Sequence, residues 1–275
     1  MRIGALDDMV LGAIIGDIVG SRFEWSNIKT KEFSFFTSAC KPTDDSLMSL
    51  AIAQALLHCN GDYSLLCERA VQSMQEIGRL YPHCGYGAMF RDWLFSDNPH
   101  PYQSFGNGSA MRVSACGFVA DTLDCAKFLA RNVTEITHNH PEGLKGAEAT
   151  AVCVFLARSG KSMRQIRDYV HKNYYQMNFT LDSIRDTYEW NSTCQGTVPQ
   201  AIMSFLESTG FEDAIRNAIS IGGDSDTLAA ITGGIAEAYY GIPIEMRTDA
   251  LPFLDERLLR ILIDFESKFP FVHCR

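Results

Sequence analysis

Apolar side chains recur along this chain at steps of three and four residues, the spacing that places them on one face of an α-helix. Residues 45–58 are a clear example, with Leu47, Leu50 and Leu57 in their apolar stripe. No stretch alternates strictly between β-branched and polar residues, as a half-buried strand does. Helices are predicted over residues 8–20, 45–58, 63–81, 121–133, 143–159, 163–171, 199–208, 211–220, 227–240 and 255–265. The pattern therefore predicts an all-α fold, in which Pro199 stands in the first turn of its helix.

Length and composition favour one large domain. The chain has 275 residues, of which 46% are hydrophobic and 21% are charged, so it can bury a sizeable core. It contains no Pro/Ser/Gly-rich linker, no low-complexity tract and no internal repeat. We therefore expect a single compact domain over residues 1–275, and the small number of apolar surface runs favours a monomer.

The charge balance bears on the class of partner. The formal net charge is -9, whereas proteins that bind nucleic acid need a basic face for the phosphate backbone. Nucleic acid is therefore not an expected partner. A small anionic ligand held by backbone amides and one or two cations is compatible with this balance.

Cysteine usage and apolar runs bear on the compartment. The nine cysteines are odd in number and form no C-x-x-C pair, which favours reduced thiols over a disulfide framework or a zinc site. The first residues lack the basic and apolar regions of a signal peptide, and no run reaches the ~20 apolar residues of a membrane span. We expect a cytoplasmic protein without a membrane partner.

Two acidic clusters, far apart in the sequence, are the main candidates for chemistry. The stretch Thr43–Asp45 precedes one predicted helix, and by itself it is typical of a helix cap. The stretch Gly222–Thr227 places Asp224 and Asp226 at the start of an apolar helix, where two close carboxylates are costly without a cation. Together the clusters offer four carboxylates and two hydroxyls. Oxygen ligands of this kind suit two hard cations, Mg²⁺ or Mn²⁺.

Two further carboxylates stand near the N-terminus. Asp17 lies among small and apolar residues of the first predicted helix, and a buried aspartate is rare unless it is paired. We expect it to bond the acidic loops from behind the metal ligands. Glu24 follows this helix between Phe23 and Trp25, where aromatic rings can raise the pKa of a carboxyl and suit it to acid or base work. The alternative is an ordinary surface glutamate.

A glycine-containing segment and a histidine pair complete the candidates. The segment Ser104–Arg112 includes Gly-Asn-Gly-Ser, whose backbone N–H groups could hold a phosphate, although Asn-Gly is also a common turn. Phe105 could stack on a base or simply pack. His138 and His140 have a spacing found in metal sites, but no third nitrogen or sulfur ligand accompanies them. A histidine that bonds a loop or a ligand phosphate is the preferred interpretation.

Taken together, these stretches resemble the ADP-ribosylglycohydrolase family. The matching motifs, in chain order, are G-D-x-x-G-x-x-x-E at 16–24, T-D-D-S at 43–46, F-G-N-G-S-A-M-R at 105–112, I-T-H-N-H-P at 136–141 and G-G-D-S-D-T at 222–227. No single motif is decisive, but all of them in the family order are specific. Ser46 and Ser225 stand where many members have threonine, and both keep the hydroxyl.

The resemblance implies an all-α domain around a binuclear Mg²⁺ or Mn²⁺ centre that hydrolyses the glycosidic bond between ADP-ribose and an acceptor. The implied metal ligands are Thr43, Asp44, Asp45, Asp224, Asp226 and Thr227. Asp17 would support them, and Glu24 matches a mobile family glutamate that approaches the metals. The residues implied to hold ADP-ribose are Ser104, Phe105, Gly106, Asn107, Gly108, Ser109, Met111 and His138.

The expected chemistry follows from these assignments. The metals would bind the ribose hydroxyls and a bridging water while the C1″ carbon develops oxocarbenium character. Glu24 and Asp45 are the expected catalytic residues. Either of them could orient or deprotonate the water, and Glu24 is favoured to assist the leaving group. The expected partner is an ADP-ribosylated protein or a small ADP-ribose conjugate.

The acceptor and the competing functions stay open at this level. Arginine is the favoured acceptor because it is common among bacterial-type members of the family and because an acidic surface would suit a guanidinium. Serine-linked or acetylated ADP-ribose would use the same core. A different Mg²⁺ hydrolase, such as a phosphoesterase or nucleoside hydrolase, is disfavoured because the acidic ligands occur at helix starts in the family order. A non-catalytic, crystallin-like relative is disfavoured because all six implied ligands are present.

Overall fold

The structure is a computed structural model that describes residues 9–269, and those residues form α-helices, short 3₁₀ turns and loops. The only strand-like pairing among them is an isolated bridge between Gly106 and Thr193. The helices are α1 (Leu11–Gly20), α2 (Asp44–Cys59), α3 (Leu66–Leu80), α4 (Ala88–Phe95), α5 (Ser114–Val119), α6 (Leu123–Glu135), α7 (Pro141–Arg158), α8 (Met163–Asn173), α9 (Leu181–Ile184), α10 (Cys194–Leu206), α11 (Phe211–Ser220), α12 (Ser225–Tyr240), α13 (Ile244–Ala250) and α14 (Glu256–Lys268). The all-α prediction is confirmed.

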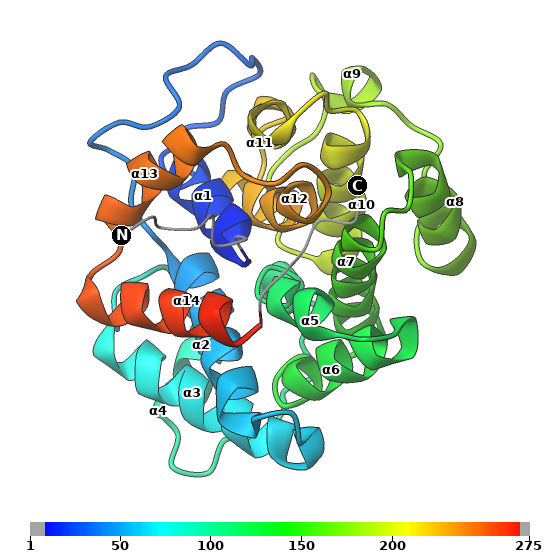
Figure 1. Ribbon diagram of the computed structural model, residues 1–275. Helices are drawn as coiled ribbons and strands as arrows, with labels where there is room; N and C mark the ends of the chain where they lie inside the picture. The colour runs from blue at the N-terminus through cyan, green and yellow to red at the C-terminus, as the bar shows by residue number, and fades with distance from the viewer. Residues whose placement is uncertain (1–8, 270–275) are drawn as a thin grey trace.

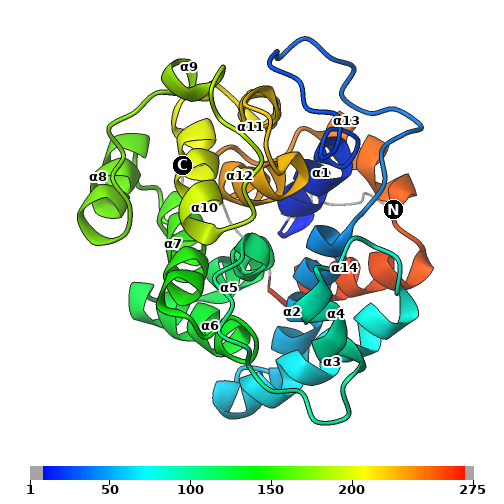
Figure 2. The ribbon, with the colours of Figure 1, turned by 180° about the vertical axis from the view of Figure 1, so that it is seen from behind.

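Two helices from opposite ends of the chain form the centre of the fold. Figures 1 and 2 show α1 and α12 side by side, with the other helices arranged around them. Every residue of α1 is buried, and so is the length of α12 from Ser225 to Ala238. The neighbours of α12 are α7, α10 and α11, while α2 packs against α1, α3 and α14. The starts of α2 and α12 therefore meet beside the C-terminal half of α1.

Small residues let α1 and α12 approach each other closely. Gly12, Gly16 and Gly20 are four residues apart and so lie on one face of α1. A Cβ atom at Gly20 would lie 2.6 Å from the Cα of Asp226, and one at Gly16 would overlap the backbone of Ala229. Because there is no room for a side chain at these positions, the backbones themselves are in contact. This contact places the carboxylates on α1 and α12 near one another.

Most predicted helices are present, with bounds that differ by a few residues. The predicted start of the first helix at Asp8 lies outside the described residues, as do the two ends of the predicted domain over 1–275. The prediction for Pro199 is wrong. Helix α10 begins at Cys194 because the Thr193 side chain caps it by accepting from the Gly196 N–H, which leaves Pro199 inside the helix. The short helices α4, α5, α9 and α13 are not predicted by the pattern, because so few turns show little periodicity.

Two other expectations bear on the described residues. Within residues 9–269 every helix is too short or too polar to cross a lipid bilayer. The eight cysteines in this part of the chain are all free thiols, as the sequence predicts. Cys274 lies outside it. The monomeric state and the cytoplasmic location stay predictions.

The substitution Gly16→Ala should destabilise the protein strongly. Its methyl group meets the backbone of α12, which cannot move aside without separating the two central helices. We expect a loss of at least about 2 kcal/mol in the free energy of unfolding, measured by urea denaturation. Gly210→Ala is the matched control, since Gly210 has extended backbone and open space around it. Equal stability of the two variants would contradict the close approach described here.

Candidate active site

Asp17 organises the start of helix α2. Its carboxylate accepts hydrogen bonds from the Thr43 N–H at 2.8 Å, the Thr43 hydroxyl at 2.6 Å, and both the N–H and the hydroxyl of Ser46. The side chain is fully buried on α1. Asp17 therefore does what the sequence predicted, since it holds the first acidic cluster in place. The supporting role that we assign to it toward a metal stays a prediction.

The start of helix α12 is shaped by a glycine turn. Gly222 and Gly223 have φ angles of 70° and 80°, a region that L side chains rarely adopt. The Asn27 side chain fixes this turn, because its amide oxygen accepts from the Gly223 N–H at 2.7 Å and its amide nitrogen donates to the Gly223 carbonyl at 2.9 Å. The helix then begins with Asp226 and Thr227 in its first turn.

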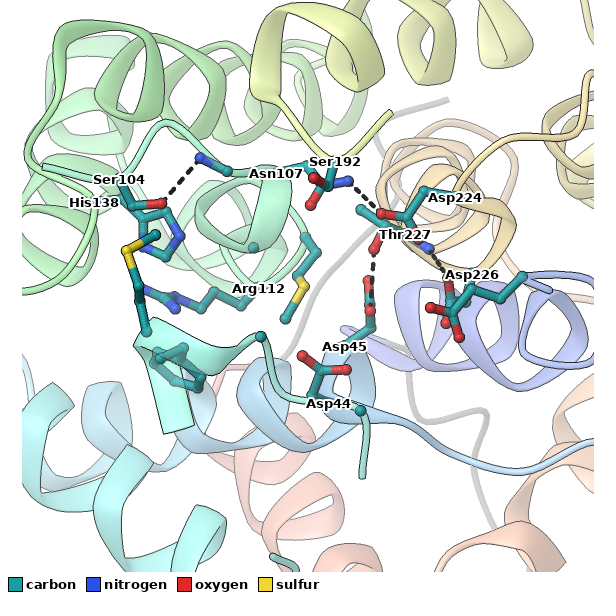
Figure 3. A pocket seen from close by; sticks show the side chains of 18 of the residues that line it. Asp44, Asp45, Ser104, Asn107, Arg112, His138, Ser192, Asp224, Asp226 and Thr227 are labelled. Atoms are coloured by element: carbon teal, nitrogen blue, oxygen red, sulfur yellow. Dashed lines mark hydrogen bonds between the residues drawn. The ribbon is translucent and has the colours of Figure 1, made fainter. Parts of the chain in front are cut away.

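The structure brings carboxylates from three segments into two groups. Oxygens of Asp17, Asp45 and Asp226 lie within 4.8 Å of one another, and so do oxygens of Glu24, Asp224 and Asp226. Asp226 belongs to both groups, so they are adjacent. The Thr227 hydroxyl donates to Asp45 at 3.2 Å and joins the starts of α2 and α12 (Figure 3). Spacings of this kind are suited to oxygen coordination of a divalent cation.

The electrostatics of this cluster favour a bound cation. Burial raises the pKa of Asp45 and Asp226 well above the usual range, and the neighbouring carboxylates raise it further. One oxygen of Asp45, Oδ1, is buried and has no hydrogen-bond partner among the described residues. A divalent cation would supply that missing partner and would offset the repulsion. The residues present therefore fit a divalent metal ion held by oxygen ligands.

Glu24 and Asp44 extend the acidic wall. Burial, and then the charge of Asp224, raise the pKa of Glu24, while a hydrogen bond from the Trp25 side chain lowers it. Glu24 is half-buried and lines the cavity beside these carboxylates, and its catalytic role stays a prediction. Burial and the charges of Asp17 and Asp224 also raise the pKa of Asp44. Asp44 faces the same cavity without joining either group of three.

The carboxylates stand at one end of a cavity of about 370 Å³. Figure 3 shows Asp224, Asp226 and Thr227 at this end, with His138 and Arg112 at the other. The cavity thus joins an acidic end to an end with aromatic and cationic side chains. Its volume falls in the range typical of small-molecule sites.

The wall between these ends is built from the segment Ser104–Met111. The Ser104 hydroxyl accepts from the Gly106 N–H at 3.1 Å, and the Asn107 N–H donates to the Ser192 carbonyl at 2.7 Å. The Asn107 side chain donates to Asp224 at 2.7 Å, so the glycine segment is tied directly to the carboxylate cluster. Gly106 and Gly108 leave open backbone beside His138, where a side chain would narrow the cavity.

The far end holds a neutral histidine and a buried arginine. Burial and the charge of Arg112 lower the pKa of His138 well below its usual value, so the ring is uncharged near neutral pH. Its Nδ1 atom is paired with the Thr137 hydroxyl at 2.7 Å. The Arg112 guanidinium donates to the same hydroxyl at 2.7 Å, and burial lowers its pKa to about 10.

Comparison with known proteins decides the family. A family profile described as ADP-ribosylglycohydrolase matches residues 6–264, which is nearly the whole chain. This protein belongs to the ADP-ribosylglycohydrolase family. The resemblance predicted from the sequence motifs is therefore confirmed.

Relatives of this chain come from animals and bacteria. ADP-ribosylhydrolase ARH3 of Homo sapiens is 26% identical, with 84% of each chain covered. The ADP-ribosyl-(dinitrogen reductase) glycohydrolase of Rhodospirillum rubrum is 25% identical, again with 84% of each chain covered. ADP-ribosylarginine hydrolase Tri1 of Pseudomonas putida is 24% identical over 85% of this chain and 70% of its own. The family and these relatives support an ADP-ribosylglycohydrolase enzyme.

A solved structure supports the fold. The chain titled ADP-ribosylglycohydrolase-related protein complex superposes with a TM-score of 0.69 and 22% identity, and the match covers 94% of this chain and 95% of that one. The helical arrangement around α1 and α12 is therefore the family's fold.

Some predicted site residues do not reach the wall of the cavity. Ser109 is fully buried, and its hydroxyl donates to backbone carbonyls of Gly106 and Gly143. Phe105 packs its ring against His140, with ring centroids 5.1 Å apart. The Thr43 hydroxyl donates its proton to Asp17, so only its oxygen lone pairs are available to contact a cation. Their assigned roles toward substrate and metal stay predictions.

The structure also adds residues that the sequence did not single out as site residues. The cavity is also lined by Trp25, Phe90, Tyr102, Arg112 and Trp190. Arg112 stands inside the F-G-N-G-S-A-M-R motif, so its place in the sequence was a usable signal. The aromatic residues carried no comparable signal, because an aromatic side chain in a sequence is most often part of the core.

Repulsion among these carboxylates predicts that loss of one charge stabilises the protein without metal and weakens its stabilisation by metal. Asp226→Asn keeps the shape of the side chain but removes one charge, so it should raise the melting temperature of metal-free protein. A divalent metal should stabilise the unchanged protein, and the same substitution should abolish most of that stabilisation. Thermal unfolding with chelator and with added metal measures both effects. Asp249→Asn, at an exposed position on α13, is the control. A metal-induced shift of equal size in Asp226→Asn would contradict the assignment.

Proposed function

We propose that this protein is a divalent-metal-dependent hydrolase that releases ADP-ribose from an acceptor, with the arginine side chain as the favoured acceptor. The observation that carries the proposal is the carboxylate cluster around Asp45 and Asp226 at one end of a 370 Å³ cavity. The other end of that cavity offers open backbone, aromatic rings and a guanidinium. A ligand with a ribose at one end and a nucleotide at the other fits this polarity.

The residues that would hold two Mg²⁺ or Mn²⁺ ions are Thr43, Asp44, Asp45, Asp224, Asp226 and Thr227. The unpartnered oxygen of Asp45 and the joint membership of Asp226 in both carboxylate groups support this set. When bound, the ions would neutralise the carboxylates and polarise the ribose hydroxyls and a water molecule. Asp17 would keep the ligands of α2 in register with those of α12.

The protein's own groups would position the ADP-ribose. Gly106 and Gly108 allow the backbone of their segment to approach the diphosphate, and Arg112 adds the positive charge at that end of the cavity. His138 is neutral and can exchange a hydrogen bond with ligand oxygens through its second ring nitrogen. Phe90 and Tyr102 offer apolar surface for the adenosine part. The scissile C1″ carbon would then lie at the carboxylate end.

Proton transfers at that end can be assigned to two carboxyls. Glu24 has a raised pKa, which suits a group that delivers a proton to the leaving acceptor atom. Asp45 lines the same end of the cavity, and we assign to it the orientation of the attacking water and the removal of its proton. The bond between C1″ and the acceptor breaks, the water oxygen bonds to C1″, and free ADP-ribose leaves.

The acceptor preference rests on charge and on relatives. The Pseudomonas putida and Rhodospirillum rubrum relatives are named for arginine-linked and dinitrogen-reductase-linked ADP-ribose. In this chain the acceptor end is lined by Glu24 and Asp224, which suit a guanidinium. The physiological substrate would be an ADP-ribosylated protein or a small ADP-ribose conjugate. Serine-linked and acetylated ADP-ribose are the alternatives.

Release of ADP-ribose from an arginine-linked peptide should require a divalent metal and the acidic cluster. Chelator should abolish turnover, and Mg²⁺ or Mn²⁺ should restore it. Asp45→Asn and Asp224→Asn should each lower kcat/KM by at least about 1,000-fold, because each removes a proposed ligand. Asp249→Asn should behave as the unchanged protein. Full activity of either cluster variant, or in chelator, would remove the proposal.

Glu24→Gln should separate chemistry from binding. The amide cannot donate an acidic proton, so we expect kcat to fall by about 100-fold or more. Binding of ADP-ribose, measured by calorimetry in the presence of metal, should change by less than about threefold. A parallel loss of affinity and turnover would instead assign Glu24 to ligand binding.

A further inference from the structure

Two tryptophans form an exposed stack at the acidic end of the cavity. The side chains of Trp25 and Trp190 are 78% and 48% exposed, and their ring centroids lie 5.9 Å apart with an angle of 22° between the planes. Large aromatic residues usually lose their exposure on folding, and exposed ones in a concave surface are typical of binding sites. The stack is therefore a candidate for ligand recognition.

The position of the stack identifies which part of the ligand it would meet. Both tryptophans line the cavity, and Trp25 directly follows Glu24, whose carboxylate lies with those of Asp224 and Asp226. Figure 3 shows the aspartates at the end opposite His138. The end that we assign to the nucleotide is therefore opposite the carboxylates that Glu24 and Trp25 adjoin. A group that extends beyond the scissile bond would meet them first.

The two loops that carry the tryptophans are joined by a hydrogen bond. Trp25 lies in the loop after α1 and Trp190 in the loop before α10. Lys29 in the first loop donates to the backbone carbonyl of Tyr188 in the second at 2.7 Å, and to that of Ile221 at 2.6 Å. The Tyr188 hydroxyl in turn donates to the Gly196 carbonyl at 2.7 Å. The stack is therefore a supported surface and not two unrelated side chains.

The charge around the stack selects the chemistry of its ligand. Glu24 and Asp224 line the cavity beside it, while the one lysine or arginine among the described lining residues is Arg112, which is 1% exposed and at the other end. Flat aromatic faces bind planar cations by cation–π contact, and bound metal would leave the carboxylates only part of their charge. A neutral or anionic group would gain only part of this.

We propose that Trp25 and Trp190 form the acceptor subsite, in which the guanidinium of an ADP-ribosylated arginine stacks on the indole surface. This inference rests on the proposed hydrolase function and adds the residues that select the acceptor. The indoles bind the acceptor and take no part in proton transfer. Their contribution should therefore appear in KM and in acceptor preference, with little change in kcat.

The decisive experiment compares Trp190→Ala, Trp190→Phe and Phe128→Ala on arginine-linked and serine-linked ADP-ribose peptides. Trp190 is the better position to vary, because Trp25 also bonds Glu24. We expect Trp190→Ala to raise KM for the arginine-linked peptide about 5- to 20-fold, with kcat within about twofold. Trp190→Phe keeps an aromatic face and should lose less. Phe128 is an exposed aromatic residue on α6, outside the cavity, and its variant is the control.

A binding measurement keeps the inference testable without turnover. Arginine amide and its neutral isostere citrulline amide are titrated against the metal-loaded protein, and tryptophan fluorescence is recorded. Arginine amide should bind at least about fivefold more tightly, and Trp190→Ala should remove that difference.

The possible results distinguish the proposed acceptor subsite from the proposed hydrolase function on which it rests. An unchanged KM and an unchanged arginine-to-citrulline ratio in Trp190→Ala would overturn the acceptor subsite, as would an equal loss on both peptides. Hydrolysis of the serine-linked peptide alone would overturn it while leaving the hydrolase in place. Trp190-dependent binding of arginine amide without hydrolysis of either peptide would support the cation site and reject arginine and serine as acceptors for hydrolysis.

Discussion

The close approach of helices α1 and α12 is the constraint on which the rest of this structure depends. Glycines at every fourth position of α1 allow its backbone to touch that of α12. This contact brings Asp17 beside Asp226, and Asp17 in turn fixes the start of α2 through its bonds to Thr43 and Ser46. The acidic cluster is therefore a result of helix packing, and its carboxylates stand in or beside the ends of packed helices.

That arrangement has an electrostatic cost. Burial of several carboxylates near one another is unfavourable unless a cation joins them, and the raised pKa values of Asp44, Asp45 and Asp226 express this cost. Neutral donors such as Asn107 and Thr227 offset only part of it. The carboxylates that are suited to hold a metal ion also destabilise the folded protein when no metal is bound.

Much of this could be predicted from the sequence, for identifiable reasons. The long helices have enough turns for their apolar spacing to show, and the acidic motifs keep short, fixed patterns next to helix starts. Other features depend on contacts between distant segments. Asn27 forms hydrogen bonds with Gly223, and Trp25 stacks on Trp190. Each pair is more than 150 positions apart, and no local sequence pattern indicates either contact. The start of α10 was predicted wrongly for a different reason. Thr193 caps the helix six residues before Pro199, although proline usually stands in the first turn.

One hydrogen bond near the core has a consequence for how the protein is made. The Gly12 N–H at the start of α1 donates to the Glu237 carboxylate on α12, across 225 positions of the chain. At ordinary rates of synthesis, about 10 to 45 s pass between the appearance of these two residues. Throughout that interval the apolar helix α1 lacks its main packing partner, and the carboxylate cluster is not yet assembled. A nascent chain of this protein therefore carries its most apolar helix incompletely covered until residues 225–240 have been synthesised.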